Sequence, residues 1–164
     1  MAISSTDIQY RLSGGASNAS PAASLGGAKS STTAGAAIFD DVSSAEATAG
    51  DVEYRCVYVH NAHASLSLIG AVLFILTNTP STSTTVDVGL GTSAVNGTEQ
   101  TVADESTAPS GVTYSAAANQ AAGIALGDIP AGQSRAVWVR RTISAGAAAV
   151  NDTFTFRAAG DTAA

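Results

Sequence analysis

The chain of 164 residues is poor in cysteine, in charge and in aromatic side chains. Its single cysteine, Cys56, excludes an intramolecular disulfide, so the chain is not a disulfide-stapled scaffold. Charged residues make up 12% of the sequence, well below the usual quarter, and aromatic residues make up 5%. Ala, Gly, Ser and Thr dominate what remains. This composition predicts an ordered protein with thin layers and a polar but uncharged surface.

Basic residues are scarce, since 7 Lys and Arg stand against 13 Asp and Glu, and Lys29 is the only lysine. A chain without basic clusters neutralises few phosphates, so we expect no nucleic-acid partner and no binding to anionic membranes. The longest apolar run, residues 66–76, is too short and too interrupted to span a bilayer. The first residues lack the basic and apolar regions of a signal peptide, which predicts synthesis in a cytoplasm.

Residues 1–50 differ in texture from the rest of the chain. Apolar and polar residues alternate over residues 7–12, which predicts a strand. Residues 16–37 are mostly Ala, Ser, Gly and Thr and contain too few large apolar side chains for a core. We therefore predict an extended N-terminal arm over residues 1–50 that lies across a neighbouring protein; the alternative is a passive leader. The candidate interface residues of this arm are Ile8, Tyr10, Leu12, Ile38 and Phe39.

Residues 51–164 contain short strand patterns separated by turn signals. β-branched and aromatic residues dominate residues 53–60 and 136–143, and apolar residues alternate with polar ones over residues 84–90. Asn96-Gly97 and the segment 127–133 are typical of turns. The predicted fold class is all-β: an immunoglobulin-like or jelly-roll β-sandwich over residues 51–164, with seven to nine strands, that folds without the arm.

Few residues of the sequence combine into the pattern of a catalytic or metal-binding site. Cys56 and His60 would lie on the same side of a strand, about 13 Å apart at the usual rise per residue, which is too far for one zinc ion. His63 follows in a turn. We interpret both histidines as turn residues and Cys56 as a small, unreactive core residue.

The acidic residues Asp40, Asp41, Glu46 and Asp51 form a loose cluster along the chain. A calcium loop needs oxygen ligands at alternating positions, a fixed glycine and a late glutamate, and this register is absent. We interpret the cluster as a solvated acidic loop. Glycine-rich segments lack the flanking residues of a phosphate-binding loop. The sequence therefore predicts a protein that is not an enzyme, with no catalytic residue, no metal and no cofactor.

Arg140 is the sixth candidate interface residue. On a strand it shares a face with Trp138, whereas Arg141 points to the opposite face. The Arg140 guanidinium can stack on Trp138 or pair with a carboxylate, and such a pair can lie within the domain or between subunits. Trp138 itself is expected to be at least half buried, by analogy with the core tryptophan of sandwiches.

Several phrases of the sequence resemble small virion structural proteins of tailed bacteriophages. The phrases are Ile8–Asn18 and Ala23–Gly27 near the N-terminus, Phe39–Ser43 and Gly50–Cys56 after it, and Leu126–Gly132 and Val137–Thr142 near the C-terminus. They cover most of the chain in pattern and include no catalytic signature. The resemblance implies a virion protein with an immunoglobulin-like sandwich.

The resemblance and the composition lead to three functional hypotheses. The first is a capsid decoration (cement) protein that stabilises the head by binding the major capsid protein. The alternative is a tail, neck or fibre component, and the third is a carbohydrate-binding sandwich module. The expected partners are other virion proteins, with a homo-oligomer in the assembled particle. The expected location is the virion, after synthesis in the cytoplasm of the bacterial host.

Overall fold

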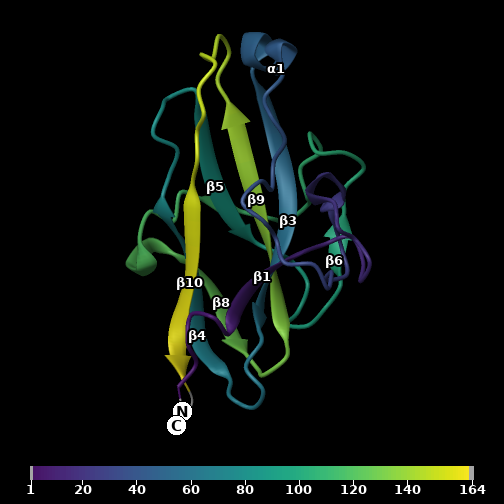
Figure 1. The fold of residues 1–164 in the computed structure, drawn as a ribbon, viewed down its shortest axis with the longest axis vertical. Coiled ribbons are helices and arrows are strands. Elements are labelled where there is room, and N and C mark those ends of the chain that lie inside the picture. Colours follow the sequence, from purple (N-terminus) through teal and green to yellow (C-terminus); the bar gives the residue numbers. More distant parts are fainter. Residues whose placement is uncertain (1, 163–164) are drawn as a thin grey trace.

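Antiparallel strands form two main sheets in the computed structural model, which describes residues 2–162 (Figure 1). The large sheet has the order β1 (Ile8–Leu12), β3 (Asp51–Asn61), β9 (Ser134–Ile143), β5 (Thr84–Leu90) and β7 (Tyr114–Ser115). The small sheet has the order β10 (Thr155–Thr162), β4 (Leu68–Thr77) and β8 (Ile124–Ile129). The remaining elements are the pair β2 (Gly26–Gly27) and β6 (Glu99–Thr101), helix α1 (Ser44–Ala49), and the 3₁₀ turns Pro21–Ala23 and Gln120–Ala122.

This architecture confirms the predicted all-β, sandwich-like fold. Eight strands, β3 to β10, lie after residue 50, within the predicted range of seven to nine. The immunoglobulin-like or jelly-roll topology stays a prediction. Within residues 2–162, no helix has the length and apolar character that crossing a lipid bilayer requires.

The main core lies between the two sheets. Alternate residues of β3, Val57 and Val59, point into it, as the two-residue period of a strand requires. β5, β9, β4 and β8 supply matching apolar residues from both sides. The core residues of these four strands include Val86, Val88, Val137, Val139, Leu73, Ile75, Leu126 and Ile129.

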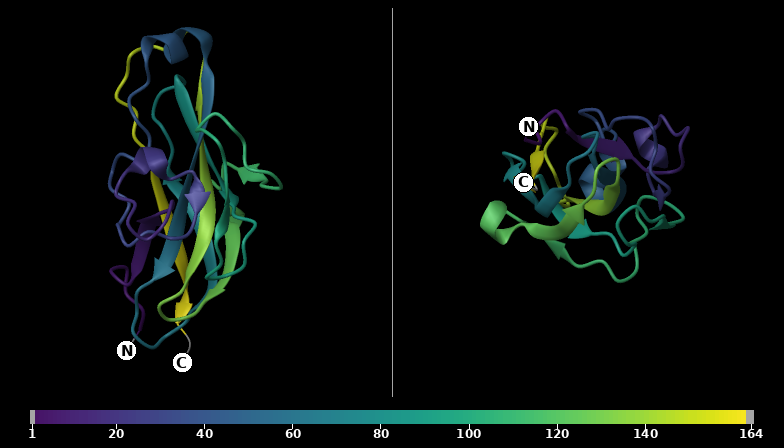
Figure 2. Two further views of the ribbon diagram at one scale, coloured as in Figure 1. Left: turned by 90° about the vertical axis from the view of Figure 1, so that its right-hand side faces the viewer. Right: turned by 90° about the horizontal axis from the view of Figure 1, so that it is seen from below.

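A second core lies on the outer face of the large sheet, away from the small sheet. The other alternate residues of β3, Cys56 and Tyr58, pack there with Trp138, and all three have 0% exposure. Segments 13–30 and 97–113 cover this face, on the side of the molecule away from β10 (Figures 1 and 2). Their backbone carbonyls bind the strand directly: Ser24 accepts the Cys56 N–H at 2.8 Å, and Gly27 accepts the Tyr58 hydroxyl at 2.6 Å. The predicted burial of Cys56 and Trp138 is thus confirmed.

Glycine makes the close approach of this covering layer possible. A Cβ atom on Gly26 would lie 1.8 Å from the carbonyl oxygen of Gln100, in the facing β6 region. Gly26 also has a φ of +98°, which side chains other than glycine rarely adopt. A segment of small residues therefore contributes to the fold through its backbone rather than through large apolar side chains.

The prediction that residues 1–50 form an arm separate from the sandwich is wrong for its apolar residues. β1 is a strand of the large sheet, paired antiparallel with β3 so that Tyr10 faces Val59. Leu12 is 1% exposed, and Ile38 and Phe39 belong to the core between the sheets. The physical reason is that the edge of β3 needs a strand partner. β1 of the same chain supplies it, so residues 1–50 contribute a strand and core residues to the sandwich. That the sandwich folds without the first fifty residues stays a prediction.

Replacing the buried Leu12 will measure how far the N-terminal strand belongs to the fold. We expect Leu12→Ala to lower the free energy of unfolding by about 2–5 kcal/mol, because it leaves a cavity in a packed core. Leu76→Ala is the matched control, since Leu76 is 56% exposed, and it should change stability little. The measurement is chemical denaturation followed by Trp138 fluorescence. Equal effects of the two substitutions would contradict the assignment of β1 to the core.

Glu99 anchors the loop that leads into β6. Its side chain is 2% exposed and accepts hydrogen bonds from the Thr92 hydroxyl and the Ser93 N–H, each at 2.9 Å. Burial acts to raise the pKa of Glu99, but the hydrogen bonds from Ser93 and Thr92 together outweigh it and bring the pKa to about 2. The folded state therefore stabilises the ionised form of the Glu99 carboxylate.

This shift predicts an acid-dependent loss of stability. Because the folded pKa lies below the ordinary value of 4.5, the stabilisation is present above pH 4.5 and is lost as the pH falls towards 2. It amounts to about 3 kcal/mol at 1.36 kcal/mol per pKa unit. Urea unfolding of the natural chain and of Glu99→Gln between pH 2 and pH 7 should converge at the acid end. Parallel pH profiles would show that Glu99 does not carry this dependence.

Candidate functional site

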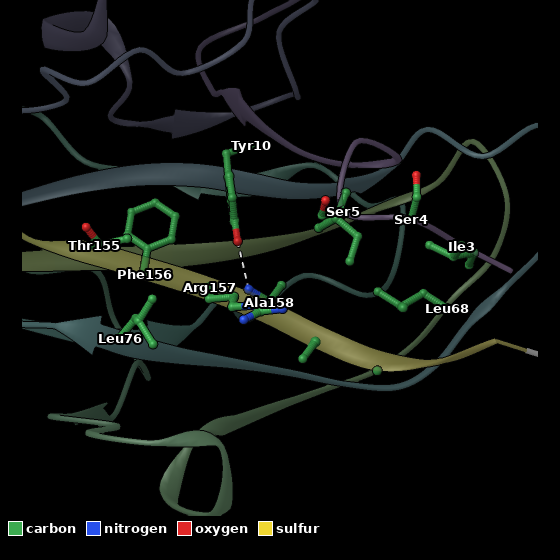
Figure 3. Close-up of a pocket in the computed structure, with 13 residues that line it drawn as sticks. Ile3, Ser4, Ser5, Tyr10, Leu68, Leu76, Thr155, Phe156, Arg157 and Ala158 are labelled. Carbon is green, nitrogen blue, oxygen red and sulfur yellow. Dashed lines mark hydrogen bonds between the residues drawn. The ribbon is translucent and has the colours of Figure 1, made fainter.

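The two sheets meet along one side of the molecule at a seam between β1 and β10 (Figure 3). β1 is an edge strand of the large sheet, and β10 is an edge strand of the small sheet. The Tyr10 ring packs edge-on against Phe156, with ring centroids 4.7 Å apart. The Tyr10 hydroxyl accepts a hydrogen bond from the Ala158 N–H at 2.7 Å. These contacts hold the two edges together.

Two apolar hollows open along the β1–β10 seam, and Tyr10 and Phe156 line both of them. The larger, of about 360 Å³, is also lined by apolar side chains from the N-terminal segment and from β4. The smaller, of about 160 Å³, is bounded further by the segment before α1 and the start of β10. The additional apolar residues are Ile3, Ile8, Leu68 and Leu76 for the first, and Ala34, Ile38 and Phe154 for the second.

Leu76 adds an exposed apolar side chain to the seam. It is 56% exposed, and within residues 2–162 the only other exposed large apolar side chain is Val150, at 49%. Figure 3 shows Leu76 beside Phe156 at the rim of the larger hollow. Leu76 thus adds an exposed apolar surface to the half-buried apolar lining of the hollow, and apolar surface of this kind is used by protein interaction sites.

β10 also presents a free backbone edge. Among the described strands its only partner is β4, so the eight residues Thr155–Thr162 have one edge without a neighbouring strand. The Tyr10 hydroxyl takes up one amide of this edge, that of Ala158. An unpaired strand edge is a template on which an extended segment of another protein can add. The seam thus combines backbone hydrogen-bonding groups with an apolar wall.

The structure brings three of the six predicted interface residues to this seam. Ile8, Tyr10 and Ile38 line the hollows, while Leu12 is buried beside β3. Phe39 is 9% exposed and lies near Phe154, with ring centroids 6.4 Å apart. The interface role of these residues is a prediction that the single chain leaves open, except that Leu12, Ile38 and Phe39 do not need a partner for burial.

Arg140 lies elsewhere, on the outer face of the large sheet. It forms an ion pair with Asp87 at 2.5 Å, so the structure contains the intradomain version of the predicted pair. The guanidinium stacks over the ring of Tyr114, 4.7 Å from its centroid, instead of over Trp138. Arg140 therefore does not belong to the β1–β10 seam.

The cysteine and the two histidines of the chain have structural roles in the fold. Burial raises the pKa of the Cys56 thiol, so it stays protonated and unreactive at neutral pH. The His63 Nδ1 atom accepts the N–H groups of Ser65 and Leu66 at 3.1 and 3.0 Å, which confirms it as a turn residue. The same interpretation is wrong for His60, which lies within β3 and is 9% exposed. Burial, together with the nearby Lys29, lowers the pKa of His60.

A scan against protein-family models and searches of curated proteins and of solved structures each returned no match for this chain.

Removing the Tyr10 hydroxyl will test the contact that closes the seam. We expect Tyr10→Phe to cost about 1–3 kcal/mol of stability, because the Ala158 N–H loses its acceptor, and to speed amide exchange at Ala158. Tyr114→Phe is the matched control, since the Tyr114 hydroxyl is buried and has no hydrogen-bond partner among residues 2–162. That control should be neutral or stabilising. A Tyr10→Phe variant as stable as the natural chain would show that the bond contributes nothing.

Proposed function

We propose that the chain is a non-enzymatic bacteriophage virion protein, a capsid decoration protein that stabilises the head by binding the major capsid protein. The observation that carries the binding part of this proposal is the free edge of β10 beside the apolar hollows. The assignment to a bacteriophage particle rests on the phrases of the sequence that resemble virion structural proteins.

The binding mode follows from the geometry of the seam. An extended segment of the capsid protein adds to β10 as a further strand, and its backbone satisfies the unpaired groups of the edge other than the Ala158 N–H, which the Tyr10 hydroxyl occupies. Alternate side chains of that segment fill the hollows beside Tyr10, Phe156 and Leu76. Each apolar side chain buried in this way contributes on the order of 1.5–3 kcal/mol when burial is complete.

Symmetry supplies the rest of the affinity. A capsid presents many identical sites, and a decoration protein that forms an oligomer on the shell engages several of them at once. Linked contacts of this kind raise the overall affinity by orders of magnitude without any new contact. A shallow seam is therefore sufficient for stable attachment.

The surface of the protein supports the two alternative functions to different degrees. A tail, neck or fibre component would use the same strand edge, so the distinction lies in the partner. A carbohydrate-binding module stacks sugars on exposed aromatic rings. Trp138 and all four tyrosines are buried or half buried, which gives that function no platform.

Substitutions of the two exposed apolar residues test the proposal. The assay is co-sedimentation of the purified protein with capsids assembled from the major capsid protein alone. We expect Leu76→Asp to weaken binding at least about tenfold, because it places a charge at the rim of the apolar hollow. Val150→Asp is the matched control and should bind normally, since Val150 is exposed but does not line either hollow.

Decorated capsids should also withstand heating better than bare ones. Undiminished binding of Leu76→Asp would contradict the role of the seam. Binding to purified tails with none to capsids would favour the tail component instead of the decoration protein.

A further inference from the structure

A buried glutamate stands at the start of β3, where the inner face of the strand changes from apolar to charged. Glu53 is 1% exposed, as is its neighbour Arg55 on the same face. One carboxylate oxygen of Glu53, Oε2, accepts a hydrogen bond from Nε of Arg141. The other oxygen, Oε1, is buried without a hydrogen-bond partner among residues 2–162. A buried carboxylate oxygen with no partner costs free energy, so a cation or hydrogen-bond donor bound at this atom would stabilise the fold.

Two groups of acidic side chains approach Glu53. On one side are Asp40 and Glu105, and both form ion pairs with Arg55. The guanidinium groups of Arg55 and Arg141 already balance the charge on that side.

On the other side are Glu46 and Asp51. Their carboxylates and that of Glu53 offer ligand atoms that all lie within 4.8 Å of one another. Neither Glu46 nor Asp51 forms an ion pair with a basic residue in the described part of the chain. Of these three described carboxylates, Glu53 alone pairs with a guanidinium, that of Arg141, which also faces Asp40. The group of Glu46, Asp51 and Glu53 therefore has an excess of negative charge.

The local fold fixes this convergence. Glu46 is held by the capping box of α1, in which its side chain accepts the Ser43 N–H at 2.6 Å. The helix ends at Gly50, whose φ of +77° reverses the chain straight into β3. Asp51 and Glu53 then project from the same face of β3, because they are two residues apart on a strand.

We propose that Glu46, Asp51 and Glu53 form a calcium site. Carboxylate oxygens are the ligands that hard divalent cations take, and Ca²⁺ binds six to eight oxygens at 2.3–2.6 Å in irregular geometry. Oxygens up to 4.8 Å apart can share one such ion. Mg²⁺ requires shorter distances and near-octahedral geometry, which favours Ca²⁺ at this irregular site. Water completes the coordination at the two partly exposed carboxylates.

The ion would join α1 to the start of β3 at one end of the molecule (Figure 1). It also supplies the partner that Glu53 Oε1 lacks within the chain. Burial acts to raise the pKa of Glu53, with Arg141 opposing it, and a bound cation would keep the carboxylate ionised. The site is independent of the β1–β10 seam, so the two proposals can fail separately.

Calorimetric titration of the chelator-treated full chain with CaCl₂ tests the site. We expect one ion per chain and a rise in the unfolding midpoint of about 5–10 °C at a hundredfold excess over the dissociation constant. Glu46→Gln and Asp51→Asn should each weaken binding about tenfold or more, since affinity depends on the number of charged ligands. Glutamine also serves in a capping box, so the first variant keeps α1 intact. NaCl at equal ionic strength should leave the midpoint unchanged.

The matched control is Asp161→Asn, which removes the same charge from β10, outside the acidic group. It should bind calcium like the natural chain. The proposal is overturned if no binding occurs at roughly 10 mM calcium, a concentration well above the dissociation constants of the weakest calcium sites in proteins. Equal affinity in Glu46→Gln, Asp51→Asn and the natural chain would place the ion elsewhere and would also overturn it. An equal response to MgCl₂ would overturn the assignment to calcium.

Discussion

The rest of the structure depends on the complete enclosure of β3. Nine of its eleven residues are buried. One face contributes Val57 and Val59 to the core between the sheets, and the other contributes Cys56 and Tyr58 to the core beneath the loop layer. β1 and β9 pair with its two edges. A strand buried on both faces and both edges needs cover from several distant segments, and this need explains why the first third of the chain folds back onto the sandwich.

The sequence predicts the strands well where side chains alternate. β5 carries the two-residue period that one buried face requires, and β9 is rich in β-branched and aromatic residues. The predicted all-β fold is confirmed. The strand at residues 8–12 is also correctly predicted, but its partner is not. Pairing with β3, some fifty residues away, is a tertiary choice that the local pattern of β1 does not encode. The sequence does not predict the role of segment 16–37, because this segment acts through backbone carbonyls and through glycines such as Gly26, which leave no apolar period.

The candidate site shows the same limit. Ile8 and Tyr10 stand out in the sequence, yet their neighbours at the seam, Phe156 and Ala158, come from the other end of the chain. The acidic group is similar: Glu46 and Asp51 are visible as acidic residues of a loop. Glu53 is hidden in a strand pattern, and only the reversal at Gly50 brings all three together. In both places the sequence identifies single side chains, whereas the three-dimensional fold determines which of them meet.

Binding through the β1–β10 seam requires the free edge of β10, and the protection of backbone amides from hydrogen exchange reports on that edge directly. Hydrogen–deuterium exchange of the protein free and bound to capsids reports on each segment separately. Strand addition predicts that the amides of β10, residues 155–162, become protected on binding, while those of β8, the opposite edge of the same sheet, stay unchanged. Protection confined to β8 or to the outer loop layer, with β10 exchanging as in the free protein, would contradict the account.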